Sequence, residues 1–170
     1  MQAIVESMLN RCLRDKEYKQ ALGIALETRR LDVLQNILSS KEVVASDPAL
    51  LSYVLQSTMT LLTKLDLRNQ VLNLLIGLFY QTEPLPDYFS MTQCFVYLND
   101  SAQAANMMKE LLKDEQSEEK VLIALQVAFD LADTATQEFL GAVRESLKPA
   151  EGATNVSFCA SSFESGLTDA

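Results

Sequence analysis

The chain has 170 residues, of which 48% are hydrophobic and 22% are charged, proportions that are typical of a globular domain and exclude a chain that is disordered throughout. Its net charge of −9 would repel phosphate backbones, so we expect no nucleic-acid partner. It has no histidine and only three widely spaced cysteines, Cys12, Cys94 and Cys159. It therefore lacks the commonest general base, the commonest zinc ligand and a disulfide framework.

The 5 glycines and 4 prolines are too few for the turns of a rich β-protein, so an all-α class is expected. The first predicted helix covers residues 2–14, the second residues 16–28 with Asp15 as its N-cap, and the third residues 31–39. In each, apolar residues recur every three or four positions, which predicts a buried stripe. The stripe of the first helix comprises Ile4, Val5, Met8, Leu9, Cys12 and Leu13.

Asp47 and Pro48 give the clearest helix start in the chain. Aspartate can accept hydrogen bonds from the free amides of the first turn, and proline has no amide to leave unpaired there. This fourth helix is predicted to reach Thr63, and a fifth opens at Asp66. The segment VLNLLIGLFY, residues 71–80, is apolar on nearly every side, which predicts neighbours on both flanks.

Four further helices are predicted after the proline-rich break near residue 85. Asp87 is the expected cap of the sixth. Asp100 with Gln103 opens the seventh, and Thr134 with Gln137 has the capping-box spacing that opens the ninth. The eighth begins near residue 118, with Val121, Leu125, Ala128 and Ala132 expected to face inward and Leu122 and Phe129 beside them.

The predicted helices form pairs whose first members begin near residues 16, 48, 87 and 118, an interval typical of helix-pair repeats. We therefore expect antiparallel helix pairs stacked as an α-solenoid-like rod over residues 1–148. A compact helical bundle is the rival interpretation. Residues 149–170 mix small residues with three acids and no base, and they are predicted to form a disordered tail.

No motif for catalysis, for a cofactor or for a metal is present. We assign no catalytic, cofactor-binding or metal-binding residue and expect no enzyme. The basic residues near Arg11 and Arg29 lie among acids and are interpreted as solvated helix faces with local ion pairs. Glu118 and Glu119 suit a helix N-terminus. Gly23 is interpreted as a point of close approach between two helices.

The chain shows no sign of membrane targeting. The N-terminal stretch has no basic region or cleavage site of a signal peptide, and the longest uncharged run, residues 48–63, is too short to span a bilayer. Cys12 and Cys94 lie in apolar helical patterns and are expected to be inert core residues. A reducing compartment, cytoplasm or nucleus, is expected.

Three segments resemble one known family, in the same order along the chain. Residues 18–32, YKQALGIALETRRLD, closely resemble a segment of the largest non-ATPase subunit of the 26S proteasome regulatory particle. Residues 93–100, QCFVYLND, are similar to that family's QC-x-x-x-L-x-D segment. Phe129–Leu131 and Gln137–Leu140 resemble its FDL and Q-x-FL segments. The resemblance covers about residues 2–147.

The resemblance implies a non-catalytic scaffold in the base of the regulatory particle. Such a scaffold supports ATP-dependent degradation of ubiquitinated proteins by holding base and lid subunits, in the cytoplasm and nucleus, without a cofactor or small-molecule substrate. Only the helical rod of the family is matched, so either the chain is a fragment or truncated product, or the full scaffold role does not apply to it. From another class, the alternative is a free-standing helical adaptor that binds a peptide or a partner helix in its groove.

Overall fold

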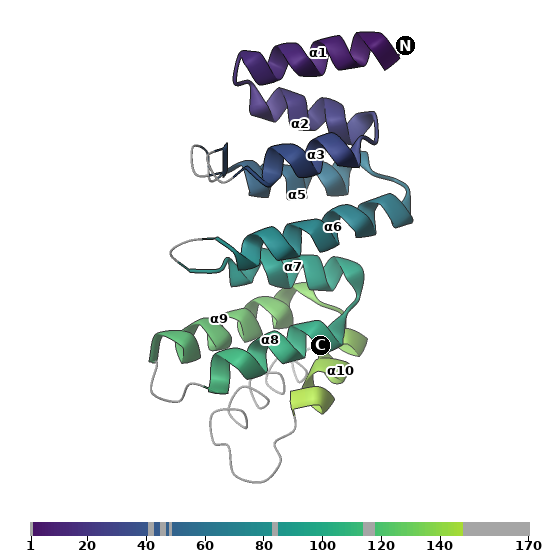
Figure 1. The fold of residues 1–170 in the computed structure, drawn as a ribbon. Helices are drawn as coiled ribbons and strands as arrows, with labels where there is room; N and C mark the ends of the chain where they lie inside the picture. Colours follow the sequence, from purple (N-terminus) through teal and green to yellow (C-terminus); the bar gives the residue numbers. More distant parts are fainter. Residues whose placement is uncertain are drawn as a thin grey trace. The chain divides into compact units, whose positions relative to one another are not determined.

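The computed structural model describes residues 2–40, 43–44, 47, 49–82, 85–113 and 118–147, and the regular elements within these ranges are all helices (Figure 1). The expected all-α class is therefore confirmed. The helices are α1 (Gln2–Arg14), α2 (Tyr18–Glu27), α3 (Leu31–Leu38), α5 (Ala49–Leu61), α6 (Leu65–Tyr80), α7 (Tyr88–Leu98), α8 (Ser101–Lys113), α9 (Glu118–Thr134) and α10 (Gln137–Leu147). The predicted tail, residues 149–170, and the predicted first-turn proline, Pro48, lie outside the described residues.

The chain divides into two compact units, residues 1–87 and residues 88–170. In the first unit, α1 packs on α2, and α2 packs on both α3 and α5. The pair α5 and α6 is stacked on the pair α2 and α3, because α2 contacts α5 while α3 contacts α6. This is one step of a helix-pair repeat, in which each pair covers the apolar face of the next.

The second unit is stacked in a related way, although α8 also packs on α9, and α9 and α10 are not a closely packed pair among the described helices. Helices α7 and α8 pack together, α9 contacts both of them, and α10 packs chiefly on α8 (Figure 1). The contacts of α7 with α9 and of α8 with α10 are the counterpart of the step in the first unit. Leu111, Leu112 and Ala124 form a buried cluster between α8 and α9. The prediction of stacked helix pairs is confirmed inside each unit.

Three of the helix turns use a non-glycine residue in the left-handed conformation. Lys16, Arg29 and Asn99 have φ of 60°, 60° and 56°. After α1, the Glu17 amide donates to the Cys12 carbonyl at 2.9 Å and the Lys16 amide donates to the Leu13 carbonyl at 3.3 Å. These two bonds define a Schellman motif, which satisfies the last carbonyls of a helix and turns the chain back.

The same pair of bonds ends α2 and α7. The Arg30 amide donates to the Ala25 carbonyl at 2.8 Å, and the Asp100 amide donates to the Phe95 carbonyl at 3.0 Å. Glycine usually occupies the left-handed position of such a turn. None of these three turns has a glycine at that position, so the sequence lacks the residue that normally marks the end of a helix.

The structure confirms some of the predicted helix caps. The Ala49 amide donates to the Asp47 carboxylate at 3.1 Å, and the Gln103 amide donates to the Asp100 carboxylate at 3.0 Å. The Gln103 side chain binds that carboxylate as well, at 2.8 Å. Both aspartates therefore satisfy free amides at the start of a helix, as predicted.

Three other predicted helix starts are wrong by one or two residues. Asp15 extends the last turn of α1, where its amide donates to the Arg11 carbonyl at 2.9 Å, and the N-cap position of α2 is Glu17. Asp66 lies inside the first turn of α6. Thr134 is still within α9, whereas the Thr136 hydroxyl accepts the Phe139 amide at 3.3 Å and caps α10.

The buried side chains follow the predicted stripes in most helices, including Leu22, Leu34, Val54, Met108 and Val143. Helix α9 is the exception. Its buried residues are Ala124, Val127, Ala128 and Leu131, so the inward face is rotated from the predicted one. Leu122 and Phe129 lie on the exposed side of the helix with 65% and 52% of their surface accessible. In α1, two residues of the predicted stripe, Ile4 and Met8, are also exposed, whereas Leu9 is buried.

Gly23 lies where α2 approaches α5, as predicted, because a Cβ added there would lie 3.3 Å from the Tyr53 hydroxyl. At Gly77 in α6, no atom of the described residues lies within 4 Å of that position. We expect Gly77→Ala to stabilise the chain by about 0.5–1 kcal/mol through helix propensity and Gly23→Leu to destabilise it by about 1–3 kcal/mol through overpacking. Denaturant unfolding measures both. Tyr53→Phe should recover part of the Gly23→Leu loss, and equal shifts for the two glycines would contradict the contact.

Thr58 is fully buried in α5, and its hydroxyl has no hydrogen-bond partner among the residues that the structure describes. Thr92 is buried equally well in α7, but its hydroxyl donates to the Tyr88 carbonyl at 2.7 Å. Because an unsatisfied buried hydroxyl costs about 1–3 kcal/mol, Thr58→Val should raise the free energy of unfolding by about 1 kcal/mol. Thr92→Val, which removes a satisfied hydroxyl, should give no gain. A stabilisation by Thr92→Val as large as that by Thr58→Val would show the orphan hydroxyl to be irrelevant.

Candidate functional site

The described residues contain no grouping that suits metal chemistry. No set of three or more His, Cys, Asp or Glu side chains lies close enough to hold an ion within them. Cys94 is buried, Cys12 is half-buried, and Cys159 lies outside the described residues. None of the helices in the described ranges is long and apolar enough to cross a membrane.

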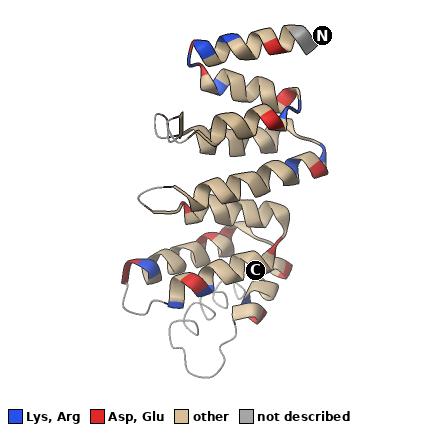
Figure 2. Cartoon of the chain, in the orientation of Figure 1, with Lys and Arg blue, Asp and Glu red and all other residues tan. Residues whose placement is uncertain are grey.

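Charged residues of the first unit gather at helix ends and turns, and α5 has none (Figure 2). The strongest grouping surrounds Arg30. Its guanidinium donates to the Asp32 carboxylate through Nε at 3.0 Å and through a terminal nitrogen at 2.8 Å, and it reaches Glu6 of α1 at 3.4 Å. The hydrogen bond from Arg30 holds the pKa of Asp32 below its usual range. The prediction of local ion pairs in the basic clusters is confirmed here.

A second ion pair ties α2 to the start of α5. The Lys19 ammonium lies 3.0 Å from the Asp47 carboxylate, whose other oxygen accepts the Ala49 amide. The hydrogen bond from Lys19 lowers the pKa of Asp47, and the bond from the Ala49 amide contributes in the same direction. Both side chains are partly exposed to solvent, so this pair orients two helices more than it stabilises them.

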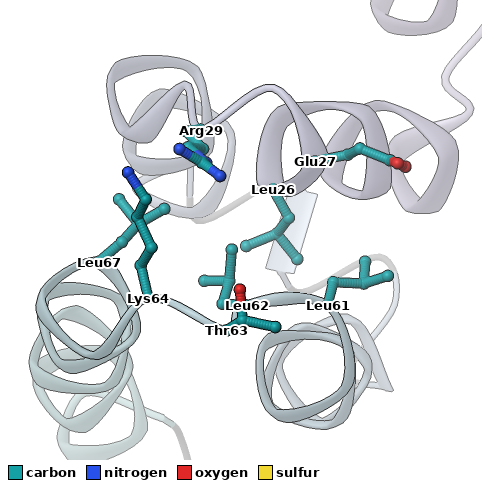
Figure 3. Close-up of a pocket in the computed structure, with 8 residues that line it drawn as sticks. All are labelled: Leu26, Glu27, Arg29, Leu61, Leu62, Thr63, Lys64 and Leu67. Carbon is teal, nitrogen blue, oxygen red and sulfur yellow. The ribbon is translucent and has the colours of Figure 1, made fainter.

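A small hollow of about 200 Å³ lies where the end of α2 meets the α5–α6 turn (Figure 3). Its walls come from the C-terminal ends of α2 and α5, from the residues just after them and from the first turn of α6. The lining residues are Leu26, Glu27, Arg29, Leu61, Leu62, Thr63, Lys64 and Leu67. Arg29 and Lys64 extend toward the same space, while Glu27 turns its carboxylate away (Figure 3).

The cations of this hollow already have a structural explanation. Arg29 and Lys64 follow the last residues of α2 and α5, and a cation is favoured at the negative end of a helix dipole. The hollow is too small to enclose a ligand of drug size. It is therefore a packing feature of the α5–α6 turn.

The most distinct surface feature of the second unit is a row on α9, which we call the α9 stripe: Glu118, Leu122, Leu125, Phe129 and Asp133. Their spacing of three or four residues places them on one side of the helix. Glu118, Leu122, Phe129 and Asp133 are exposed, and Leu125 is half-buried against the α8–α9 cluster. As predicted, Glu118 and Glu119 lie in the first turn of α9.

Sequence inspection missed the exposure of this row, although a signal was present. Helix α9 has more apolar residues than one buried stripe needs, in the run VLIALQVAFDLA. A helix that is apolar on both sides is covered on both sides or exposes one of them.

Comparison with known proteins places the chain in a family. Residues 1–165 match the family described as 26S proteasome subunit RPN2, N-terminal domain. The chain belongs to this family. The resemblance seen in the sequence segments is therefore confirmed over nearly the whole chain.

Named relatives come from animals, plants and fungi. The chain is 41% identical over 148 residues to the 26S proteasome non-ATPase regulatory subunit 1 of Drosophila melanogaster. The aligned segment covers 87% of this chain and 14% of that protein. Homolog A of the same subunit in Arabidopsis thaliana is 39% identical over 147 residues, 86% of this chain and 14% of the relative. The Schizosaccharomyces pombe regulatory subunit rpn2 is 38% identical, over 86% of this chain and 15% of the relative. The chain thus spans only about one-seventh of their length.

The ion pair between Lys19 and Asp47 makes a prediction about pH. The folded-state pKa of Asp47 is lowered from an unfolded value near about 4, so the pair stabilises the fold above that pH and the contribution is lost as pH falls through the folded pKa. Asp47→Asn keeps a capping oxygen but removes the charge. Its stability should fall below that of the parent at neutral pH and converge with it in acid.

The control is Lys19→Met, in which the same Asp47→Asn change should lose most of its pH-dependent effect. Chemical unfolding between pH 2 and pH 7 gives the comparison. A difference between parent and Asp47→Asn that is constant over this range would contradict the ion-pair assignment.

Proposed function

We propose that this chain is a non-catalytic scaffold segment of the 26S proteasome regulatory particle, where it supports ATP-dependent degradation of ubiquitinated proteins. The observation that supports this most is its identity of 38–41% to subunits named as 26S proteasome regulatory subunits, over 86–87% of the chain. The matching family is the N-terminal domain of RPN2. The role of the whole subunit is carried over to this segment as part of the proposal.

The proposed mechanism is geometric. Stacked helix pairs keep their outward faces in fixed positions within each unit, and such faces suit contacts with neighbouring proteins. The partners would be base and lid subunits of the particle, in the cytoplasm and nucleus, without a nucleic acid, a membrane or a small-molecule substrate. The acidic net charge of −9 agrees with the absence of a nucleic-acid partner.

The relatives are named as regulatory subunits. We therefore extend the proposal to an absence of catalysis, so the purified chain should hydrolyse neither ATP nor peptides nor ubiquitin conjugates. The sequence supports this because it lacks histidine and the nucleotide-binding and nucleophile motifs. Turnover that vanished on changing one of the chain's own residues would overturn this part of the proposal.

The test of the scaffold role is expression of the tagged chain in cells, followed by affinity purification and native gels. A constant set of regulatory-particle subunits should copurify with it. In cells depleted of the full-length subunit, the chain should not restore capped proteasomes, because it spans only about one-seventh of its relatives.

The matched control is Leu22→Asp, which places a charge at a fully buried position of α2 and should abolish copurification by unfolding the first unit. Diverse extended peptides in place of proteasome subunits would support the free-standing adaptor and reject the scaffold. Restored capped proteasomes would show that the chain alone is sufficient.

A further inference from the structure

The α9 stripe exposes apolar surface that the second unit does not use. Leu122 and Phe129 are 65% and 52% exposed, although both are large apolar residues. Their spacing of seven residues, with Leu125 between them, repeats the i, i+3, i+7 pattern by which one helix anchors to another. The buried residues of α9, Ala124, Val127, Ala128 and Leu131, occupy the opposite side, so the stripe is a second apolar face of α9 that the described residues leave exposed.

Carboxylates close this apolar row at both ends. Glu118 lies one turn before Leu122, and Asp133 lies one turn after Phe129. Both are exposed, and neither is ion-paired with another of the described residues. The two carboxylates are separated by 15 residues, or about 22 Å along the helix axis. A complementary surface would present apolar residues between two cations at this separation.

Charge argues against two occupants from the chain itself. A second copy that paired its α9 stripe with the first in antiparallel orientation would place Glu118 opposite Asp133 at both ends, and like charges in contact are unfavourable. Residues 149–170 include Phe158, Phe163 and Leu167, but their ionisable residues are three acids and no base. Neither occupant supplies the cations that the stripe requires.

We propose that the α9 stripe is a docking surface for a basic amphipathic helix of another protein. That helix would have apolar residues about seven positions apart and a lysine or arginine roughly one turn beyond each of them. Because acids lie at both ends of the stripe, the charges alone allow either direction of the docked helix. The partner is a proteasome subunit only if the scaffold role proposed above holds, so binding and partner identity are measured separately.

The first measurement uses a labelled helical peptide of about 18 residues with leucines spaced to match Leu122 and Phe129 and lysines beyond them. Fluorescence anisotropy with the folded chain should show saturable binding that weakens as salt is added. A peptide with glutamates in place of the lysines should bind at least tenfold more weakly. Equal binding of the two peptides would overturn the proposal.

Variants of the chain locate the binding surface. Leu122→Gln with Phe129→Gln should reduce affinity at least tenfold, whereas Leu65→Gln in α6, at a residue of similar exposure (61%), should not change it. Glu118→Lys with Asp133→Lys should reverse the preference and favour the glutamate peptide. All of these positions are exposed, so circular dichroism and the unfolding midpoint should show that the fold persists. Unchanged affinity in the Leu122 and Phe129 variant would reject the stripe.

The second measurement finds the natural occupant. A photo-crosslinking residue replaces Leu122, or Leu65 as control, in the tagged chain expressed in cells, and the linked peptide is identified by mass spectrometry. The expected product at Leu122 is a lysine- or arginine-flanked amphipathic helix of another protein. A cross-link to a second copy, to residues 149–170 or to an acidic segment would refute the assignment. A basic helix from outside the proteasome would keep the docking surface and reject the scaffold role.

Discussion

No helix of this chain can cover its own apolar face, and the arrangement of each unit follows from that constraint. Isolated helices of 8 to 17 residues, the lengths found here, are marginal in water, so they need tertiary packing to persist. In the first unit, α2 packs against α1, α3 and α5. Its buried residues are Ala21, Leu22, Ala25 and Leu26. In the second unit, α8 likewise packs against three helices, α7, α9 and α10.

The turns make this stacking compact. A left-handed residue at Lys16, Arg29 or Asn99 reverses the chain within a few residues, so consecutive helices become neighbours. For a non-glycine residue this conformation costs on the order of 1 kcal/mol. The helix contacts that follow each turn must offset that cost. The ion pairs Lys19–Asp47 and Arg30–Glu6 join segments that are not consecutive, α2 with the start of α5 and the α2–α3 turn with α1, and help to align them.

Sequence inspection predicted the helices well because apolar spacing depends on local geometry. It failed where two residues close together in the sequence could perform the same role. Asp15 and Glu17 both precede α2, and Thr134 and Thr136 both precede the described start of α10, so the choice between them depends on the three-dimensional turn. The turns at Lys16 and Arg29 gave no glycine signal. In α9, the inward face depends on where α7 and α8 lie, and no spacing rule contains that information.

The functional interpretation has a different origin. Helical spacing alone predicts a scaffold or adaptor but does not distinguish them. The segment YKQALGIALETRRLD and the match to the RPN2 N-terminal family provide the identification. The α9 stripe, by contrast, became visible only from the structure, because burial decides which apolar face of the helix is used.

Native-state hydrogen exchange, resolved helix by helix, tests most directly whether stacking holds the fold together. In the first unit, amides of α2 should open with the highest free energy, because three helices cover it, and amides of α1 with the lowest, because its main contact is with α2. In the second unit, α8 should be the most protected. Exchange in α1 as slow as in α2, or α8 no better protected than its neighbours, would contradict the account.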